Sequence, residues 1–353
     1  MNHERIFPRI WAALAATLFA ISLSAHAQNS PAKKNSAQNQ KRKIAAPKIS
    51  LSPRFVPGES FRYNMEYETT NETLRKGFAT DPQGPSSVAV DWSATLRIDI
   101  LPSDGPPGTL RLKATYEKST ASIRSDTFDP SSAETSDQYR RLEGRTIEFV
   151  LGPDGKVLKV SGLEGMVDSE KSAESAQEWI AQIGAGSGAP LGGVSVGQTW
   201  SSEQPAGSLP LAGLVWRADS EYLGNESCHP PNPDLPPNPT ASDPPTSAKT
   251  SSNAALDCAV ILAKLSLVRP KSARETTPPE LLQKGVRSAG KWTGSAQSLL
   301  YVSLASGLVV SATQTGSEEM DVTLTSSHNT TMRYRGTIST RSQVALVVDE
   351  TKK

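Results

Sequence analysis

Segments in which every second residue is apolar restrict the fold of this chain more than any other feature. Between residues 61 and 69, Phe61, Tyr63, Met65 and Tyr67 alternate with polar or charged residues. Side chains of a β-strand point alternately to the two faces of a sheet, so this pattern predicts a strand with one buried face. The pattern returns along the chain, which predicts a mainly antiparallel β protein.

Further strands are predicted over 92–100, 110–116, 146–151, 156–160, 216–223, 259–268, 299–304, 308–313, 321–325, 331–334 and 343–348. Turn sequences at 152–155 (Gly-Pro-Asp-Gly) and 306–307 (Ser-Gly) predict two hairpins. Most connections are short enough for antiparallel neighbours. We therefore expect a curved antiparallel sheet or half-barrel of about 10–12 strands, in a single domain over residues 50–350.

The segment 163–183 breaks this alternation. Its apolar residues are Leu163, Met166, Val167, Ala173, Ala176, Ile180 and Ile183. They fall three, four, six or seven positions apart, with charged and polar residues between them, which predicts one amphipathic helix. Gly184 and Gly186 would end it. An amphipathic helix among strands buries its apolar side on the concave face of the sheet.

The first 27 residues have the parts of a secretory signal peptide. Arg5 and Arg9 precede an uncharged apolar run over 10–24, and small residues at Ala25 and Ala27 predict cleavage before Gln28. The run is shorter than the roughly 20 residues of a membrane span, although an uncleaved anchor is the alternative. No cysteine follows it, so a lipid-modified N-terminus is not expected. Residues 28–49 are polar and basic and predict a disordered linker, with peripheral contact to anionic lipid as the alternative to a solvated segment.

Cys228 and Cys258 are the two cysteines of the chain. Export to the periplasm or the exterior favours a disulfide between them. The residues between them, 229–255, are rich in proline and poor in apolar side chains, which predicts a disordered insertion between two paired strands. A redox or metal role for the pair is the alternative, but a single neighbouring histidine makes a poor zinc site.

Other motifs weigh against nucleic-acid binding and catalysis. The net charge of +1 lacks the basic excess of a nucleic-acid-binding protein. The sequence Gly-Val-Ser-Val-Gly at 193–197 matches a nucleophile elbow, but Gln198 and Trp200 lead into a predicted strand where that motif requires a helix. We interpret it as a loop before a strand in which Trp200 packs inward. A hydrolase is therefore not expected, and neither a cofactor nor a metal is predicted.

Carboxylates are plentiful, but the sequence does not show which of them face one another. A glycosidase would need two on opposite sides of a sugar. The adjacent pair Glu318 and Glu319 is interpreted as one exposed charge and one edge charge on a solvated hairpin.

The order of these pieces resembles a set of exported bacterial β proteins of uncharacterised function, which in turn resemble the LolA/LppX-type half-barrel carriers of lipids and lipoproteins. The likeness rests on a Pro-Gly-Glu-Ser-Phe-Arg-Tyr strand start at 57–63, the hairpin at 144–162, the helix after it, Val-Gly-Gln-Thr-Trp at 196–200 and the hairpin around 306–307. The resemblance implies an open antiparallel half-barrel whose concave face holds an acyl chain, with the helix as plug or lid.

We accordingly expect a non-enzymatic protein of the cell envelope that binds an apolar ligand, such as a lipid or lipoprotein, or a partner protein. The alternative is a scaffold or surface module that binds no small ligand. The residues predicted to face the ligand are Leu96, Ile98, Leu112, Met166, Trp179, Ile180 and Ile183.

Overall fold

The computed structural model describes most of the predicted strand-forming region. The described residues are 48–77, 85–102, 105–106, 109–126, 136–137, 139–152, 157–162, 189–190, 192–206, 210–228, 257–270, 276–328 and 330–347. The predicted signal peptide, the helix predicted over 163–183, the insertion at 229–255 and nearly all of the 28–49 linker lie outside these ranges.

The described residues form eleven strands and a short helix, α4 (Pro279–Gln283). The strands are β1 (Ser60–Gly77), β2 (Ser86–Leu101), β3 (Leu110–Ser125), β4 (Thr146–Leu151), β5 (Val157–Ser161), β6 (Thr199–Pro205), β7 (Val215–Ser227), β8 (Asp257–Val268), β9 (Val286–Ser303), β10 (Val309–Ser326) and β11 (Thr331–Val347). No helix within the described ranges is both long and apolar enough to cross a membrane.

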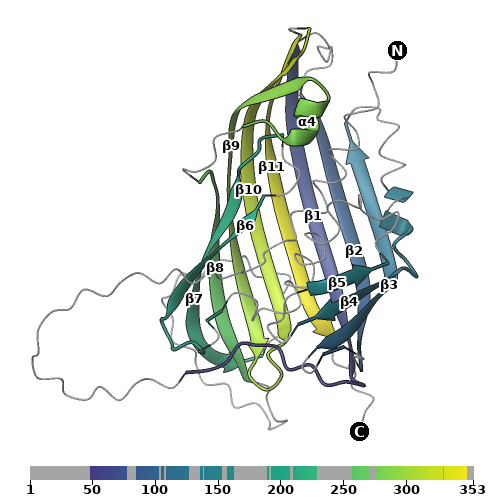
Figure 1. Ribbon diagram of the computed structural model, residues 1–353, viewed down its shortest axis with the longest axis vertical. Helices are drawn as coiled ribbons and strands as arrows, with labels where there is room; N and C mark the ends of the chain where they lie inside the picture. Colours follow the sequence, from purple (N-terminus) through teal and green to yellow (C-terminus); the bar gives the residue numbers. More distant parts are fainter. Residues whose placement is uncertain are drawn as a thin grey trace, which may run out of the picture.

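All eleven strands belong to one sheet, in the order β5-β4-β3-β2-β1-β11-β10-β9-β8-β7-β6. The chain enters at the centre with β1 and adds strands outward to the edge strand β5 (Figure 1). It then resumes at the opposite edge with β6 and returns strand by strand to β11, which pairs with β1. Every pairing is antiparallel, so the predicted fold class is confirmed.

Several strands are longer than the sequence pattern predicts. The segments 308–313 and 321–325 belong to the single strand β10, and 331–334 and 343–347 both lie in β11. In the middle of β10 the alternating positions are Gln314, Gly316 and Glu318, which carry no apolar signal. Pairing with β9 and β11 along its length keeps this stretch extended.

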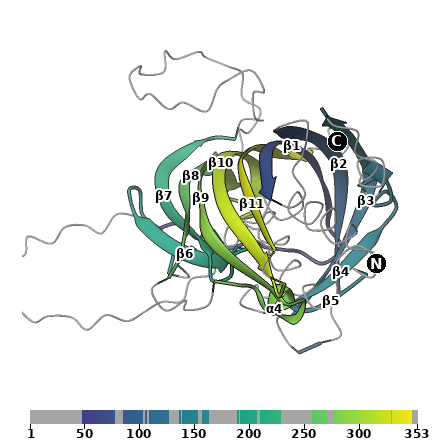
Figure 2. The ribbon, with the colours of Figure 1, turned by 90° about the horizontal axis from the view of Figure 1, so that it is seen from above.

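The sheet curls so that one face is concave (Figure 2). On β1, Tyr63, Met65 and Tyr67 are buried, whereas the alternate residues Glu66 and Glu68 are exposed. The buried set points to the concave side, because side chains from non-adjacent strands meet there. For example, a Cβ at Gly294 in β9 would lie 2.8 Å from Cη2 of Trp216 in β7. We call this side the concave face.

Charged side chains form ion pairs on the opposite face. Asp321 on β10 accepts hydrogen bonds from Arg333 and Arg335 on β11, with N–O distances of 2.6–2.9 Å. Arg124 on β3 likewise pairs with Asp91 on β2 at 2.8 Å. Exposed pairs of this kind each contribute roughly 0–1 kcal/mol, so they favour this face as the solvent side without dominating stability.

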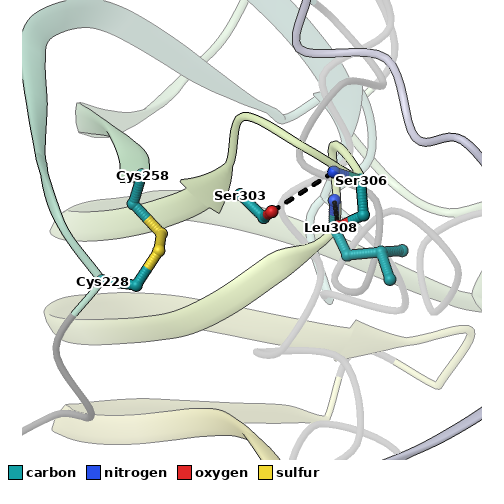
Figure 3. Close-up of a disulfide and its surroundings, with 5 residues drawn as sticks. All are labelled: Cys228, Cys258, Ser303, Ser306 and Leu308. Atoms are coloured by element: carbon teal, nitrogen blue, oxygen red, sulfur yellow. Dashed lines mark hydrogen bonds between the residues drawn. A yellow bond between two sulfur atoms is a disulfide. The ribbon is translucent and has the colours of Figure 1, made fainter. Parts of the chain in front are cut away.

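A disulfide joins Cys228 and Cys258 (Figure 3), as the sequence predicts. Their Cα atoms are 5.0 Å apart, and 30 positions separate them in the chain. Cys258 begins β8 and pairs in register with Ser303, at the turn between β9 and β10. Because β7 and β8 pair up to this point, the bridge closes the base of the predicted insertion. It also indicates an oxidising environment.

We predict that the disulfide contributes about 3–4 kcal/mol to the free energy of unfolding, because it closes a loop of about 30 residues in the unfolded chain. Thermal and urea unfolding should shift to lower midpoints after reduction. The Cys228→Ser/Cys258→Ser double variant should show the same shift and should not respond to reductant. Equal stability of the oxidised, reduced and double-serine proteins would contradict the prediction.

Candidate functional site

Large apolar side chains gather in separate clusters on the concave face. One lies over β1 to β4 and includes Tyr63, Leu96, Ile98, Leu112 and Phe149. The three strand residues predicted to face a ligand thus lie together, each at most 1 % exposed. The other four predicted residues, Met166, Trp179, Ile180 and Ile183, lie outside the described ranges. The ligand-facing role of all seven remains a prediction.

Two further clusters lie towards the two ends of the long strands. Trp292, Met320 and Tyr334 belong to a cluster that also contains Leu281 of α4. Near the other end, Tyr222 and Val309 belong to a cluster with Trp200, Leu51 and Val194. Between them, in the middle of β6 to β11, lies a smaller cluster of Ala218, Ala263 and Leu265, with Ala296 and Leu300 packed against it.

Small residues occupy this middle part of the concave face. They are Ser202 on β6, Ala218 and Ser220 on β7, Ala263 on β8, Ala296 and Ser298 on β9, Gly316 on β10, and Thr340 and Ser342 on β11. Register pairing places them in two neighbouring rows that run across the strands, and we call them the small-residue band. The only larger side chains in these two rows of β7 to β11 are Leu265 and Gln314.

Polar groups at the β6 end of the band have no partner within the described structure. The hydroxyls of Ser202 and Ser220 and the indole N–H of Trp200 are buried and make no hydrogen bond to any described residue. Trp200 pairs in register with Ser220, and Ser202 pairs with Ala218, so the three groups are neighbours. A buried polar group without a partner costs about 1–3 kcal/mol, which a ligand atom at this place would offset.

A buried carboxylate lies beside the band on β10. Glu318 is 4 % exposed and is the one charged side chain among the buried residues that the structure describes. Its Oε2 accepts a hydrogen bond of 2.7 Å from Nε1 of Trp292. Its Oε1 is buried and accepts no hydrogen bond from any described residue. Burial raises the pKa of Glu318 to about 7, and the hydrogen bond from Trp292 opposes this rise.

Gly294 makes room for this carboxylate. A Cβ at this position would lie 2.9 Å from Cγ of Glu318 and 2.8 Å from the indole of Trp216. Both distances are shorter than carbon atoms tolerate, so a larger residue would displace one of the two side chains. The absence of a side chain at Gly294 therefore lets Glu318 and Trp216 occupy neighbouring positions on the concave face.

Tyr67 on β1 interacts electrostatically with Tyr139 and with Glu318. Burial is the main cause that raises the pKa of the Tyr67 phenol, and the charges of Tyr139 and Glu318 raise it further. The backbone carbonyl of Tyr139 accepts a hydrogen bond from the hydroxyl of Ser119, which in turn accepts one from the indole of Trp92. The hydroxyl of Tyr139 is buried and makes no hydrogen bond to a described residue. Tyr67 is thus the group that interacts with both Glu318 and Tyr139.

The interpretation of Glu318 as a charge on a solvated hairpin is wrong. Glu318 lies within β10, away from its turns, and its side chain is buried. Its neighbour Glu319 is exposed on the opposite face. The sequence held a usable signal, since Glu318 shares its alternation with Met320, Val322 and Leu324. Period two alone would have placed it on the buried face.

The Gly-Val-Ser-Val-Gly segment at 193–197 forms a turn that leads into β6, as we predict. The backbone N–H of Ser195 donates to the side-chain oxygen of Gln198 at 3.1 Å, and Trp200 is buried two residues later. Val194 packs near the start of β10, whereas His328, the histidine within the described ranges, follows the far end of that strand. The 18 residues of β10 thus separate Ser195 from this histidine.

Comparisons with known proteins identify no family. No protein-family model and no curated protein matches the sequence. Among solved structures, one of lipovitellin, described for its lipid–protein interactions, aligns at 10 % identity and a TM-score of 0.40 over 84 % of this chain. This chain spans about a quarter (26 %) of that lipovitellin chain.

Two other solved structures align over most of their own length. The outer membrane protein OprG from Pseudomonas aeruginosa aligns at 7 % identity and a TM-score of 0.18, covering 85 % of this chain and 100 % of that one. DynF from the dynemicin biosynthesis pathway of Micromonospora chersina aligns at 8 % identity and a TM-score of 0.16, covering 94 % and 98 %. With TM-scores below 0.5, none of the three likenesses indicates a function for this chain.

We predict that Glu318→Gln stabilises the protein at pH 8. The folded-state pKa of about 7 exceeds the ordinary carboxyl value of 4.5, so the folded state binds more protons between these values and loses stability as the pH rises through that window. Glutamine keeps an acceptor for the indole of Trp292 but carries no charge. The variant should gain roughly 2–3 kcal/mol at pH 8 relative to wild type, and about nothing at pH 4.

Urea unfolding at pH 4, 6 and 8 measures this effect, and Glu319→Gln on the exposed face is the matched control. The control should follow the wild-type pH dependence. A Glu318→Gln profile parallel to wild type across the whole range would show that the carboxyl titrates normally.

Proposed function

We propose that this protein is a non-enzymatic binding protein of the cell envelope, and that its concave face holds the apolar chain of a lipid-like ligand along the small-residue band. The observation that carries the proposal is the band itself, flanked by apolar clusters and bordered by buried polar groups without described partners.

The composition of the band supports an occupant other than its own side chains. Protein interiors pack as densely as organic crystals, so a face meant only for the core would carry large apolar residues at these positions. Here Ala263, Ala296, Ser298 and Gly316 follow one another across β8, β9 and β10. Such short side chains contribute little contact area of their own to the concave face.

The dimensions of the band suit an extended hydrocarbon chain. It crosses six strands, β6 to β11, and neighbouring strands lie about 4.8 Å apart, so it extends about 24 Å across the sheet. A lipid chain within one leaflet spans about 15 Å, half of the hydrocarbon core of a bilayer. One chain would therefore fit along the band, with room for a polar head at one end.

The disulfide and the predicted signal peptide support a location outside the cytoplasm. Oxidising compartments such as the periplasm allow the bond between Cys228 and Cys258 to persist. A lipid in an aqueous compartment needs a protein surface that shields its chain, and a concave apolar face provides one.

We predict that a long-chain alcohol with an uncharged environment-sensitive fluorophore binds the protein, and that Ala296→Phe weakens this binding. The phenyl ring would replace at least two methylene groups of the bound chain. At about 0.8 kcal/mol per buried methylene, the dissociation constant should rise about tenfold. Fluorescence titration measures it, and thermal melts confirm that each variant is folded.

Ser295→Phe, the adjacent residue on the opposite face, is the matched control and should bind the probe like wild type. If wild type binds no probe and Ala296→Phe loses stability, a segment of the protein fills the band. That result would favour a scaffold over a carrier.

A further inference from the structure

No described residue balances the charge on Glu318. Buried carboxylates in proteins are almost always paired with a cation or held by several hydrogen bonds. Here burial raises the pKa of Glu318, the Trp292 hydrogen bond opposes this rise, and no positively charged described residue contributes. Arg75 on β1 shares the concave face. It pairs in register with Tyr334 on β11, which pairs with Val322 on β10, four residues beyond Glu318.

The hydrogen bond with Trp292 does not by itself require a carboxylate. An indole N–H needs one acceptor, and a glutamine or serine would supply it without a charge. A glutamate at this position costs more to bury and leaves a second acceptor, Oε1, without a described donor. A hydrogen-bond donor from outside the described residues would satisfy Oε1 and would offset the cost of burying the charge.

The position of the carboxylate connects it to the small-residue band. Glu318 is the next inward residue of β10 after Gly316, which lies in the band, and it faces Gly294 on β9. A molecule lying along the band thus has Glu318 at its border. Tyr139, whose hydroxyl is buried and without a described partner, interacts electrostatically with Tyr67, as Glu318 does.

We propose that Glu318 is the head-group site of the concave face, and that the ligand is a long-chain amphiphile whose protonated amine donates a hydrogen bond to Oε1 while its chain lies along the small-residue band. This assignment rests on the proposed function. A protonated amine supplies both the missing donor and the missing positive charge, and its hydrogen bond to a carboxylate is stronger than that of a neutral group. A hydroxyl head supplies the donor alone, and a carboxylate head adds like charge.

The test uses displacement of the uncharged fluorescent alcohol by dodecylamine, dodecanol and dodecanoate, which share one chain and differ in the head. All three are used below their micelle-forming concentrations at pH 8, where Glu318 is largely ionised. We expect dodecylamine to bind about tenfold more tightly than dodecanol, and dodecanoate to bind most weakly. Glu318→Gln should bring the dissociation constants of the amine and the alcohol together, without weakening the alcohol.

Glu319→Gln removes the same charge from the exposed face and should preserve the wild-type order. Its result separates a contact with Glu318 from a general attraction of the amine to the protein. An order in which the amine has no advantage, or an advantage that survives Glu318→Gln, overturns the head-group assignment and leaves the chain-binding proposal standing. If neither the fluorescent alcohol nor any of the three competitors binds, the proposed function fails and the head-group site fails with it.

Discussion

The pairing of β1 with β11 is the interaction on which the rest of the structure depends. It joins strands from the start and the end of the sheet-forming region, from Arg62 opposite Val347 to Gly77 opposite Met332. Without it, β1 to β5 and β6 to β11 would be two separate sheets, each with a further exposed edge. With it, the alternation of side chains runs in one register across all eleven strands. One face therefore carries the apolar clusters of both halves.

The concave face is uneven, and the unevenness follows from residue size. Leu96, Ile98 and Phe149 fill the β1 to β4 side with large side chains, all nearly inaccessible to solvent. Ala296, Ser298 and their neighbours on β6 to β11 are small. Serine and threonine on this face keep the strand geometry, since their backbone still pairs, but they contribute little apolar area. The sheet therefore pairs its backbone over its full width, while its large apolar side chains gather in clusters that small residues separate.

Glu318 sets the polar character of this face. In a low-dielectric surrounding, its ionised form is costly unless a partner is supplied, which is why its pKa lies near neutrality. A small change of environment therefore decides whether the group is charged. A protein that only had to satisfy the indole of Trp292 would gain stability from a neutral acceptor. The carboxylate therefore costs stability that a neutral acceptor would not cost.

The alternation of apolar residues determined the fold class, the approximate number of strands and several hairpins, because side-chain direction in a strand depends only on parity. The cysteine pair and the composition between them likewise indicated the disulfide. The sequence pattern did not predict that 308–313 and 321–325 belong to one strand. Gln314, Gly316 and Glu318 between them carry no apolar signal, and only pairing with β9 and β11 keeps this stretch extended. Nor did it show that small residues of six strands lie side by side, or that Glu318 lacks a cation among the described residues. Those properties depend on register between strands distant in the chain, which only the tertiary structure decides.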